Sequence, residues 1–205
     1  MSRTPFLKKK IIFFLAVVLF FVDLSAQKKN MKFQVFSIEQ GLSQSSIYAI
    51  YQDTTGFLWF GTEDGLNKYD GYEFDIYKED PDVSESLSYN YIKAIVEDKA
   101  GNLWIGTYGG GINKFLKKEN KFIRLPPDPE SSSHNFINSL CFDSEGYLWA
   151  ATEDGLDRIE PVSLKVTTFR TIQNDPGSLS HNKVYSVCLD KAGVLWVGTA
   201  GGLNR

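Results

Sequence analysis

The sequence predicts an all-β fold, a β-propeller of four-stranded antiparallel blades, and three observations support the prediction. Tryptophans recur at intervals of 45, 45 and 47 residues. The text around each one follows the pattern Asp-x-x-Gly-x-Leu-Trp-x-Gly-Thr, with Ala in place of the last Gly in the third copy. Each copy contains four short strand-like segments, and a repeat of about 40–50 residues with this content is typical of propeller blades. The tryptophans are Trp59, Trp104, Trp149 and Trp196.

The first strand of the first copy is predicted over Ile47–Gln52, where β-branched and aromatic residues predominate. A hairpin turn follows, because an Asp side chain can bond the backbone of its own turn and Gly supplies the positive φ that closes it. Both residues recur in every copy, which favours a structural role over a catalytic one. The turn residues are Asp53, Gly56, Asp98, Gly101, Asp143, Gly146, Asp190 and Gly193.

The second strand of each copy holds the tryptophan, and a third strand and a fourth strand follow after short turns. A single sheet of this kind is apolar on both faces, so neighbouring blades must cover each other. The tryptophans are therefore expected between blades. The small residue two positions after each Trp is expected to let the neighbouring backbone approach closely. These small residues are Gly61, Gly106, Ala151 and Gly198.

The propeller is predicted to occupy residues 27–205, with blades over 41–80, 86–126, 133–171 and 179–205, the last incomplete. Residues 32–38 match the text of later fourth strands and are predicted to form an orphan fourth strand. A closed ring of four blades fits this phase, although its last strand would be clipped. An incomplete ring of a larger propeller is the favoured interpretation.

Residues 1–26 match a secretory signal peptide, with basic residues, then the apolar run 11–22, then Ser25 and Ala26. The run is shorter than the roughly 20 apolar residues of a membrane helix. Leu24 is larger than a cleavage site prefers, so an uncleaved anchor stays open as an alternative. The protein is accordingly expected to be exported, with its propeller in the periplasm.

The composition excludes several classes of function. An aromatic content of 14% excludes a disordered chain, and a net charge of −3 without a basic patch excludes nucleic acid as a partner. No metal or other cofactor is expected, because His134 and His181 lie in different blades without clustered ligands. Cys141 and Cys188 occupy equivalent positions in adjacent blades, too far apart for a disulfide, and are predicted to be buried free thiols.

The repeated core, extended by Gly-Leu-Asn after the tryptophan strand and preceded by Leu-Ser-x-x-x-Ile, resembles the two-component regulator propeller repeat over residues 32–205. The resemblance implies the periplasmic sensor region of a hybrid two-component histidine kinase of Bacteroidetes type, with seven-bladed propellers. It also implies an oligosaccharide ligand, a homodimeric parent protein and signalling by phosphorelay. This chain is then expected to be an N-terminal fragment, and the membrane span and kinase would belong to its missing C-terminal part.

Loop positions that differ between blades are candidate binding residues, whereas recurring positions are more simply structural. If the first strand is innermost, the loop entering it and the loop between the second and third strands share one face. Aromatic, imidazole and carboxylate groups there provide the stacking faces and directional hydrogen bonds of a sugar site. The candidate ligand-binding residues are Tyr89, Tyr108, His134, His181, Glu63, Asp64, Glu153 and Asp154.

Two other classes of function stay open. A propeller lyase or glycosidase would need one unusual blade with a base and a nucleophile within reach of each other. No such blade is visible, so no catalytic residue is predicted and the enzymatic status of the chain is left undecided. A stand-alone exported propeller that binds another protein through its rim is the second alternative, since the fold alone does not define a ligand.

Overall fold

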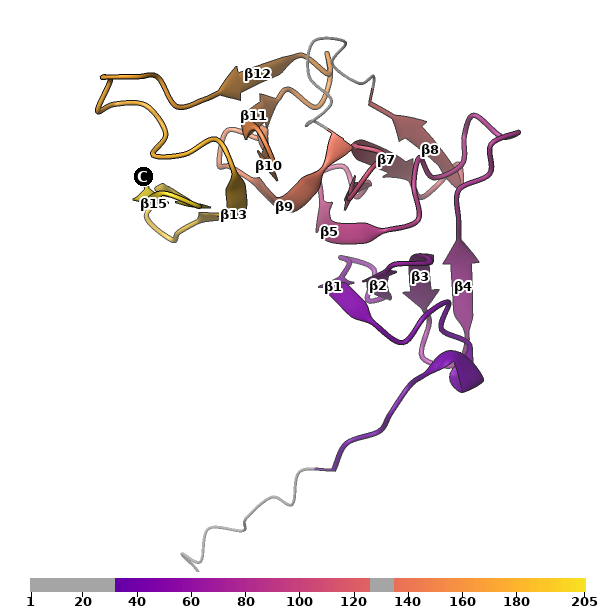
Figure 1. Ribbon diagram of the computed structural model, residues 1–205. Coiled ribbons are helices and arrows are strands. Elements are labelled where there is room, and N and C mark those ends of the chain that lie inside the picture. The colour runs from indigo at the N-terminus through magenta and orange to yellow at the C-terminus, as the bar shows by residue number, and fades with distance from the viewer. Residues whose placement is uncertain (1–31, 126–134) are drawn as a thin grey trace, which may run out of the picture. The chain divides into compact units, whose positions relative to one another are not determined.

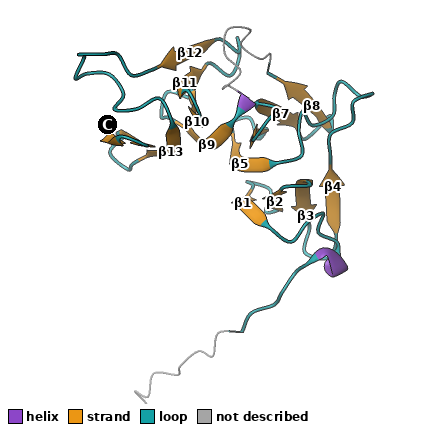
Figure 2. Cartoon of the chain, in the orientation of Figure 1, coloured by secondary structure: helices purple, strands orange, loops and turns teal. Residues whose placement is uncertain are grey.

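The computed structural model describes residues 32–125 and 135–205 of the chain (Figure 1). The chain divides into two compact units, Met1–Val35 and Phe36–Arg205, and every strand of the described residues lies in the second unit. The signal peptide predicted over residues 1–26 and the candidate ligand residue His134 lie outside the described residues. Strands joined by loops make up almost all of the second unit, with a short 3-10 turn over Ile38–Gln40 (Figure 2).

The second unit forms four antiparallel sheets, in each of which strands adjacent in sequence are adjacent in space. The first sheet contains β1 (Ile47–Gln52), β2 (Leu58–Thr62), β3 (Gly65–Tyr69) and β4 (Phe74–Tyr77). The second contains β5 (Ile92–Glu97), β6 (Leu103–Thr107), β7 (Ile112–Leu116) and β8 (Lys121–Arg124). The third contains β9 (Ile137–Phe142), β10 (Leu148–Thr152), β11 (Gly155–Ile159) and β12 (Val166–Phe169). The fourth contains β13 (Val184–Leu189), β14 (Leu195–Thr199) and β15 (Gly202–Asn204).

Each sheet is one blade, and the first strands of successive blades lie beside one another, β1 next to β5, β5 next to β9 and β9 next to β13 (Figure 1). The predicted all-β propeller fold is therefore confirmed, and β1 has the limits that were predicted for the first strand. The first strand of each blade is the innermost one. The loop that enters it and the loop between the second and third strands therefore share one face, as predicted.

The orphan strand predicted over residues 32–38 is not formed in the structure. Residues 32–37 have no regular secondary structure, and the 3-10 turn begins directly after Ser37, whose side chain caps it together with Gln40. A strand exists only when a neighbour supplies backbone hydrogen bonds. Within the second unit, residues 36–38 pair with no described strand.

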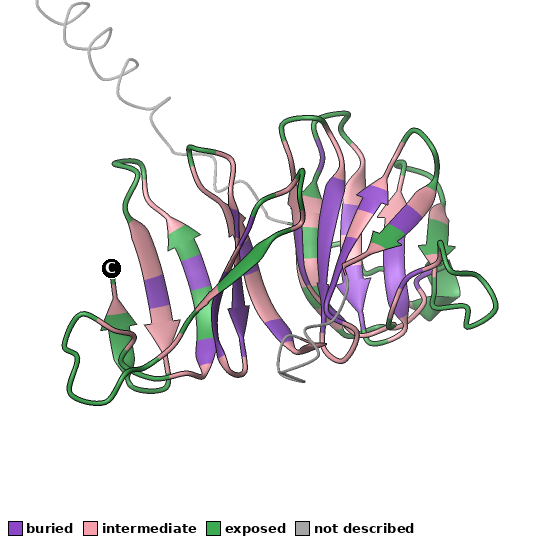
Figure 3. Cartoon of the chain, turned by 90° about the horizontal axis from the view of Figure 1, so that it is seen from above, coloured by how far each residue is buried: buried purple, intermediate pink, exposed green. Residues whose placement is uncertain are grey.

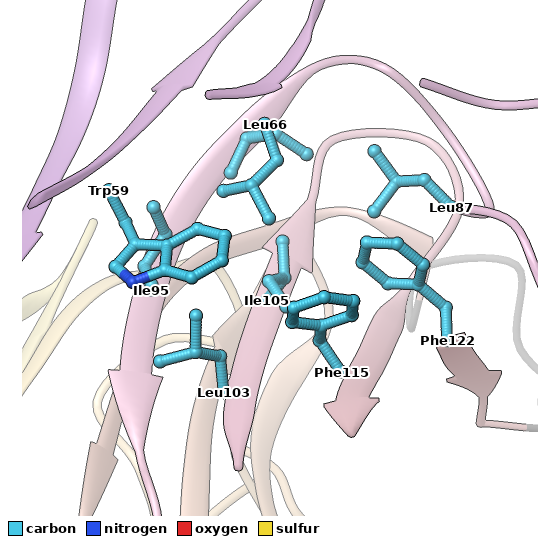
Figure 4. Packing of buried hydrophobic residues seen from close by; sticks show 9 residues of the cluster. Trp59, Leu66, Leu87, Ile95, Leu103, Ile105, Phe115 and Phe122 are labelled. Atoms are coloured by element: carbon cyan, nitrogen blue, oxygen red, sulfur yellow. The ribbon is translucent and has the colours of Figure 1, made fainter. Parts of the chain in front are cut away.

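Apolar side chains gather between the blades rather than within a single central core. Between the first and second blades, Trp59 packs against Leu103, Ile105 and Phe115, with ring centroids of Trp59 and Phe115 5.7 Å apart (Figure 4). A second cluster around Trp104 joins the second and third blades, and a third cluster around Val184 joins the third and fourth. Buried residues accordingly follow the strands, and most loops are exposed (Figure 3).

The tryptophans are not equally buried. Trp59 and Trp104 are 1% and 0% exposed, whereas Trp149 and Trp196 are half-buried. The partner of Trp149 is the fourth sheet, which has three strands, and no further sheet covers Trp196 in the described residues. Burial between blades thus depends on a complete neighbouring sheet.

The cysteines show the same dependence on a neighbouring blade. Both are free, as predicted, but only Cys141 is shielded, by the fourth sheet, and burial raises the pKa of its thiol to about 11. The prediction that Cys188 is buried is wrong. Cys188 is exposed because it lies on the face of the last sheet that no further described sheet covers.

The sequence predicted that the small residue two positions after each Trp lets the backbone of the next blade approach. At Gly61 and Gly106 the structure instead places a side chain of the next blade there. A Cβ on Gly61 would lie 2.6 Å from Cγ2 of Ile92, and one on Gly106 would lie 2.5 Å from Cγ2 of Ile137. In each case the isoleucine belongs to the innermost strand of the next blade. The glycine therefore allows a β-branched side chain to seat against it.

Gly106→Ala is expected to lower the free energy of unfolding by about 1–3 kcal/mol, because the added methyl overpacks the contact with Ile137. Backbone strain does not contribute, since Gly106 has no positive φ. Urea unfolding measures the change, and Ala151→Gly, at the same position of the third blade, is the control with a cost of about 1 kcal/mol or less. A Gly106→Ala protein as stable as the unmodified chain would contradict this packing.

Candidate functional site

The Asp-x-x-Gly turns lie at one end of the sheets, here called the back face. In all four blades, one oxygen of the turn aspartate accepts backbone N–H groups of the turn, and the other accepts the indole N–H of the following tryptophan. The glycines adopt φ values between +81° and +96°. The indole-to-carboxylate distances are 2.9 Å for Trp59–Asp53, 3.0 Å for Trp104–Asp98, 2.7 Å for Trp149–Asp143 and 2.8 Å for Trp196–Asp190. In each blade the carboxylate therefore ties the hairpin turn to the tryptophan strand.

A groove of about 1000 Å³ also opens on the back face, between the first and second blades. Its floor includes Trp59 and Phe115, which are almost fully buried, and its wall includes Lys117. The Lys117 ammonium contacts Asp53 at 3.0 Å and Glu97 at 2.6 Å. The charged groups beside the groove thus already pair with each other across the contact between the two blades. The groove is the outer part of that contact.

The opposite end, where the innermost strands begin, is here called the front face. Four aromatic rings form a continuous row across the first three blades. The ring centroids of Tyr48 and Tyr91 are 4.9 Å apart, those of Tyr91 and Tyr108 5.6 Å, and those of Tyr108 and Phe136 5.0 Å. These four residues are called the aromatic row. Of the predicted site residues, Tyr108 lies within it.

Lys93 projects over this row from the second position of β5. Its Nζ lies 5.1 Å from the ring centroid of Tyr48, 5.6 Å from that of Tyr91 and 5.8 Å from that of Tyr108. These distances are within the range of cation–π attraction, near its outer limit. The ammonium group is therefore held above several rings rather than pressed against one.

Glu63 of the β2–β3 turn, Glu153 of the β10–β11 turn and Lys183 lie near the aromatic row and Lys93. The aromatic row and these four charged residues are here called the front-face cluster. Glu63 accepts a hydrogen bond of 2.5 Å from the hydroxyl of Tyr48, and this bond raises the pKa of that hydroxyl above its usual range. Glu153 accepts from Asn138 at 3.1 Å and from Lys183 at 2.7 Å. Burial raises the pKa of Glu153, but the bonds from Lys183 and Asn138 outweigh burial and lower it, with a smaller contribution from the charge of Lys93.

The aspartates that follow these glutamates point elsewhere. Asp64 pairs with Lys78 at 2.6 Å, just after the end of β4. Asp154 pairs with Arg170 at 3.2 Å and accepts from Asn182. In each of these two turns the glutamate thus bonds to side chains of the front face. The aspartate that follows it pairs with a basic residue next to the outermost strand of its own blade.

Tyr89 and His181, the remaining predicted residues that the structure describes, contact their own or neighbouring loops. The ring of Tyr89 covers the glycine loop after β6, since a Cβ on Gly109 would lie 2.7 Å from Cε1 of that ring. His181 accepts a 2.9 Å hydrogen bond from the backbone N–H of Lys183 and so closes its own turn. Tyr108 therefore lies in the aromatic row, Glu63 bonds to Tyr48 of that row, and Glu153 bonds to Asn138 and Lys183. Tyr89, His181, Asp64 and Asp154 have local partners instead.

Tyr48, Tyr91, Lys93 and Phe136 were not predicted as site residues, because they lie at the start of innermost strands, which the repeat pattern predicts only as structural. The missed positions differ between blades, which is the same signal that had been applied to the loops. At the second position of the strand, the four blades have Tyr48, Lys93, Asn138 and Tyr185, and just before the strand they have Ser46, Tyr91, Phe136 and Lys183.

Within residues 32–125 and 135–205, no three His, Cys, Asp or Glu side chains are grouped closely enough to hold a metal ion. The same part of the chain contains no helix long and apolar enough to cross a membrane.

The pattern of four repeats matches a known family. The model of the two-component regulator propeller matches residues 41–64, 86–109, 131–154 and 178–201, one segment in each blade. The chain belongs to the two-component regulator propeller family. Each matched segment contains an innermost strand, its hairpin turn and the tryptophan strand, which are the parts that recur in the structure.

The chain is similar to a histidine kinase and to the extracellular domains of candidate two-component systems. Histidine kinase P4 of Formosa agariphila is 51% identical over 65 residues, which are 32% of this chain and 5% of the kinase. The extracellular domain of a candidate hybrid two-component system of B. thetaiotaomicron is 30% identical with a TM-score of 0.73, covering 83% of this chain and 24% of that domain. A second such domain from the same organism is 24% identical with a TM-score of 0.74, covering 86% of this chain and 23% of that domain, and supports the fold alone. This regulator propeller thus spans about a quarter of the solved domains that it resembles.

Proposed function

We propose that the chain is the ligand-sensing propeller of a hybrid two-component sensor histidine kinase, exported to the periplasm, and that its ligand is an oligosaccharide. The family match and the 30% identity to an extracellular domain of a candidate hybrid system support the sensor assignment. The identity to a histidine kinase supports the coupling to phosphorelay. Any kinase activity belongs to a longer parent protein.

The front-face cluster is the observation that supports a sugar ligand. Tyr48, Tyr91 and Tyr108 provide a row of aromatic faces, and such faces pack well against the C–H surfaces of sugar rings. Glu63 and Glu153 provide acceptors beside the row. A few polar groups converging on an apolar surface are typical of small-ligand sites.

Ligand binding transmits a signal only if it favours one state of the receptor over another. We expect the parent protein to be a homodimer with two arrangements, one of which presents the aromatic row so that the ligand binds more tightly. The difference in affinity then shifts the dimer toward that arrangement and changes the activity of the kinase across the membrane.

Tyr108→Ala is expected to weaken oligosaccharide binding about tenfold, equivalent to about 1.4 kcal/mol, because it removes one of the two inner rings of the row. Isothermal calorimetry, guided by a thermal-shift screen of oligosaccharides, measures the affinity. The matched control is Tyr72→Ala, which removes a ring that is 94% exposed on the β3–β4 turn at the back face.

The same screen discriminates the sensor from its alternatives. If none of the oligosaccharides stabilises the chain, a protein-binding scaffold becomes the better interpretation. Turnover of chromogenic glycosides would instead indicate an enzyme.

A further inference from the structure

We infer that Lys93 makes the front-face cluster a binding point for an anionic group, so that the ligand is an acidic oligosaccharide carrying a carboxylate or a sulfate. This inference rests on the proposed function and specifies the class of ligand. It depends on which charged groups of the cluster already have partners and which one does not.

Four charged side chains lie in the cluster, and three of them are bound to another side chain. Lys183 and Glu153 form an ion pair at 2.7 Å, and Glu63 accepts the hydroxyl of Tyr48. Within the described residues, Lys93 has no carboxylate within ion-pair distance and makes no hydrogen bond. Its contacts there are the three tyrosine rings.

The rings leave the ammonium group of Lys93 available to a ligand. A lysine ammonium has three donors, and a ring face more than 5 Å away satisfies none of them as a hydrogen bond would. An arriving carboxylate or sulfate can accept these donors while the sugar ring lies against the tyrosines. The charge of the Glu153 carboxylate is already balanced by Lys183, while its oxygens keep acceptor sites beside those used by Asn138 and Lys183.

The position of Lys93 is specific to the second blade. The residues at the same register of the other blades are Tyr48, Asn138 and Tyr185, so the propeller fold itself does not require a cation there. The cation at this position is therefore not part of the repeated blade structure, and it lies among the rings without a counter-ion in the described residues.

Calorimetric titration of the full chain with three probes tests the inference. The probes are trigalacturonate, which carries carboxylates, a sulfated galactotriose and neutral galactotriose. At least one acidic probe is expected to bind at least tenfold more tightly than the neutral one, with an affinity that falls as salt is added. The two acidic arms show whether the anionic group is a carboxylate or a sulfate.

Lys93→Gln is expected to weaken binding of the acidic probe at least about tenfold. Binding of neutral galactotriose is expected to stay unchanged. Lys93→Arg keeps the charge and should retain most of the affinity. Lys99→Gln removes the same charge from the turn after Asp98 on the back face and should bind as the unmodified chain does. Thermal midpoints of all variants verify that they are folded.

Equal binding of the acidic probe by Lys93→Gln and the unmodified chain would overturn the inference. So would tighter binding of neutral galactotriose than of both acidic probes, which would leave the proposed sugar sensor intact. Failure of all three probes to bind would count against the sugar sensor and the inference together.

Discussion

Replacing Trp104 with alanine lowers the free energy of unfolding by about 3–5 kcal/mol, the cost of truncating a buried aromatic side chain. Trp104 is fully buried between the second and third blades, and its ring lies beside Phe142 and under the ammonium group of Lys114. The substitution also removes the indole donor to Asp98, which leaves that carboxylate with a missing partner. Urea unfolding monitored by circular dichroism measures the change.

Two further substitutions separate the causes. Trp104→Phe keeps much of the apolar volume but removes the indole N–H, so it isolates the hydrogen bond to Asp98. Trp196→Ala truncates the equivalent, half-buried ring of the last blade and should cost clearly less than Trp104→Ala. A loss below about 1 kcal/mol for Trp104→Ala would show that packing between blades does not stabilise the fold.

Replacing Lys117 with methionine is expected to cost a similar amount, about 3–5 kcal/mol, because it leaves two buried carboxylates without their cation. Lys117 follows β7 of the second blade and contacts Asp53 of the first blade and Glu97 of its own. The side chains of Asp53 and Glu97 are 0% and 2% exposed. Glu97 also accepts the backbone N–H of Thr54, so the network joins the two blades.

The control for this variant is Lys121→Met. Lys121 lies 3.7 Å from Glu85 and 3.5 Å from Glu119, and both of these carboxylates are exposed. Exposed pairs contribute about 1 kcal/mol or less, so this variant should unfold almost as the unmodified chain does. Equal costs for the two lysine variants would contradict the burial of the Lys117 network.

The same network makes the chain sensitive to acid. Burial alone would raise the pKa of Asp53, but hydrogen bonds from Thr55, Trp59 and Lys117 outweigh it and lower the pKa to about 2. The pKa in the unfolded chain is about 4, so the ionised carboxylate contributes stability above pH 4 that is lost as the pH falls toward 2. The shift corresponds to about 2 kcal/mol. Unfolding measured between pH 2 and 5 should show this slope, and Lys117→Met should show less of it.

The architecture of the chain could be predicted because each blade repeats a local pattern. The alternation of short strands, the Asp-x-x-Gly turn and the tryptophan strand are decided by residues within a few positions of each other. Four copies of the same pattern then reinforce one another. The hairpin turn at Asp53 and the strand Ile47–Gln52 follow from such local preferences, and the structure has both where they were predicted.

The front-face cluster could be predicted only in part, since it combines side chains from separate blades. Tyr48, Lys93 and Phe136 come from three different blades, and they join one row of contacts only because neighbouring blades pack side by side. Glu63 and Asp64 are adjacent in sequence, yet one reaches this cluster and the other pairs with Lys78. No local rule distinguishes them.

The sequence by itself determined the number of repeats, the order of the strands and the family of the chain, because these depend on patterns that recur along the chain. Only the tertiary structure decided which side chains are shielded and which meet. Cys141 and Cys188 hold the same register in adjacent blades, yet one is covered by the next sheet and the other is exposed. Burial and contact between blades depend on the adjacent blade, whose equivalent residues lie about 45 positions away in the sequence. Each repeat has similar residues, but the blade that packs against it differs.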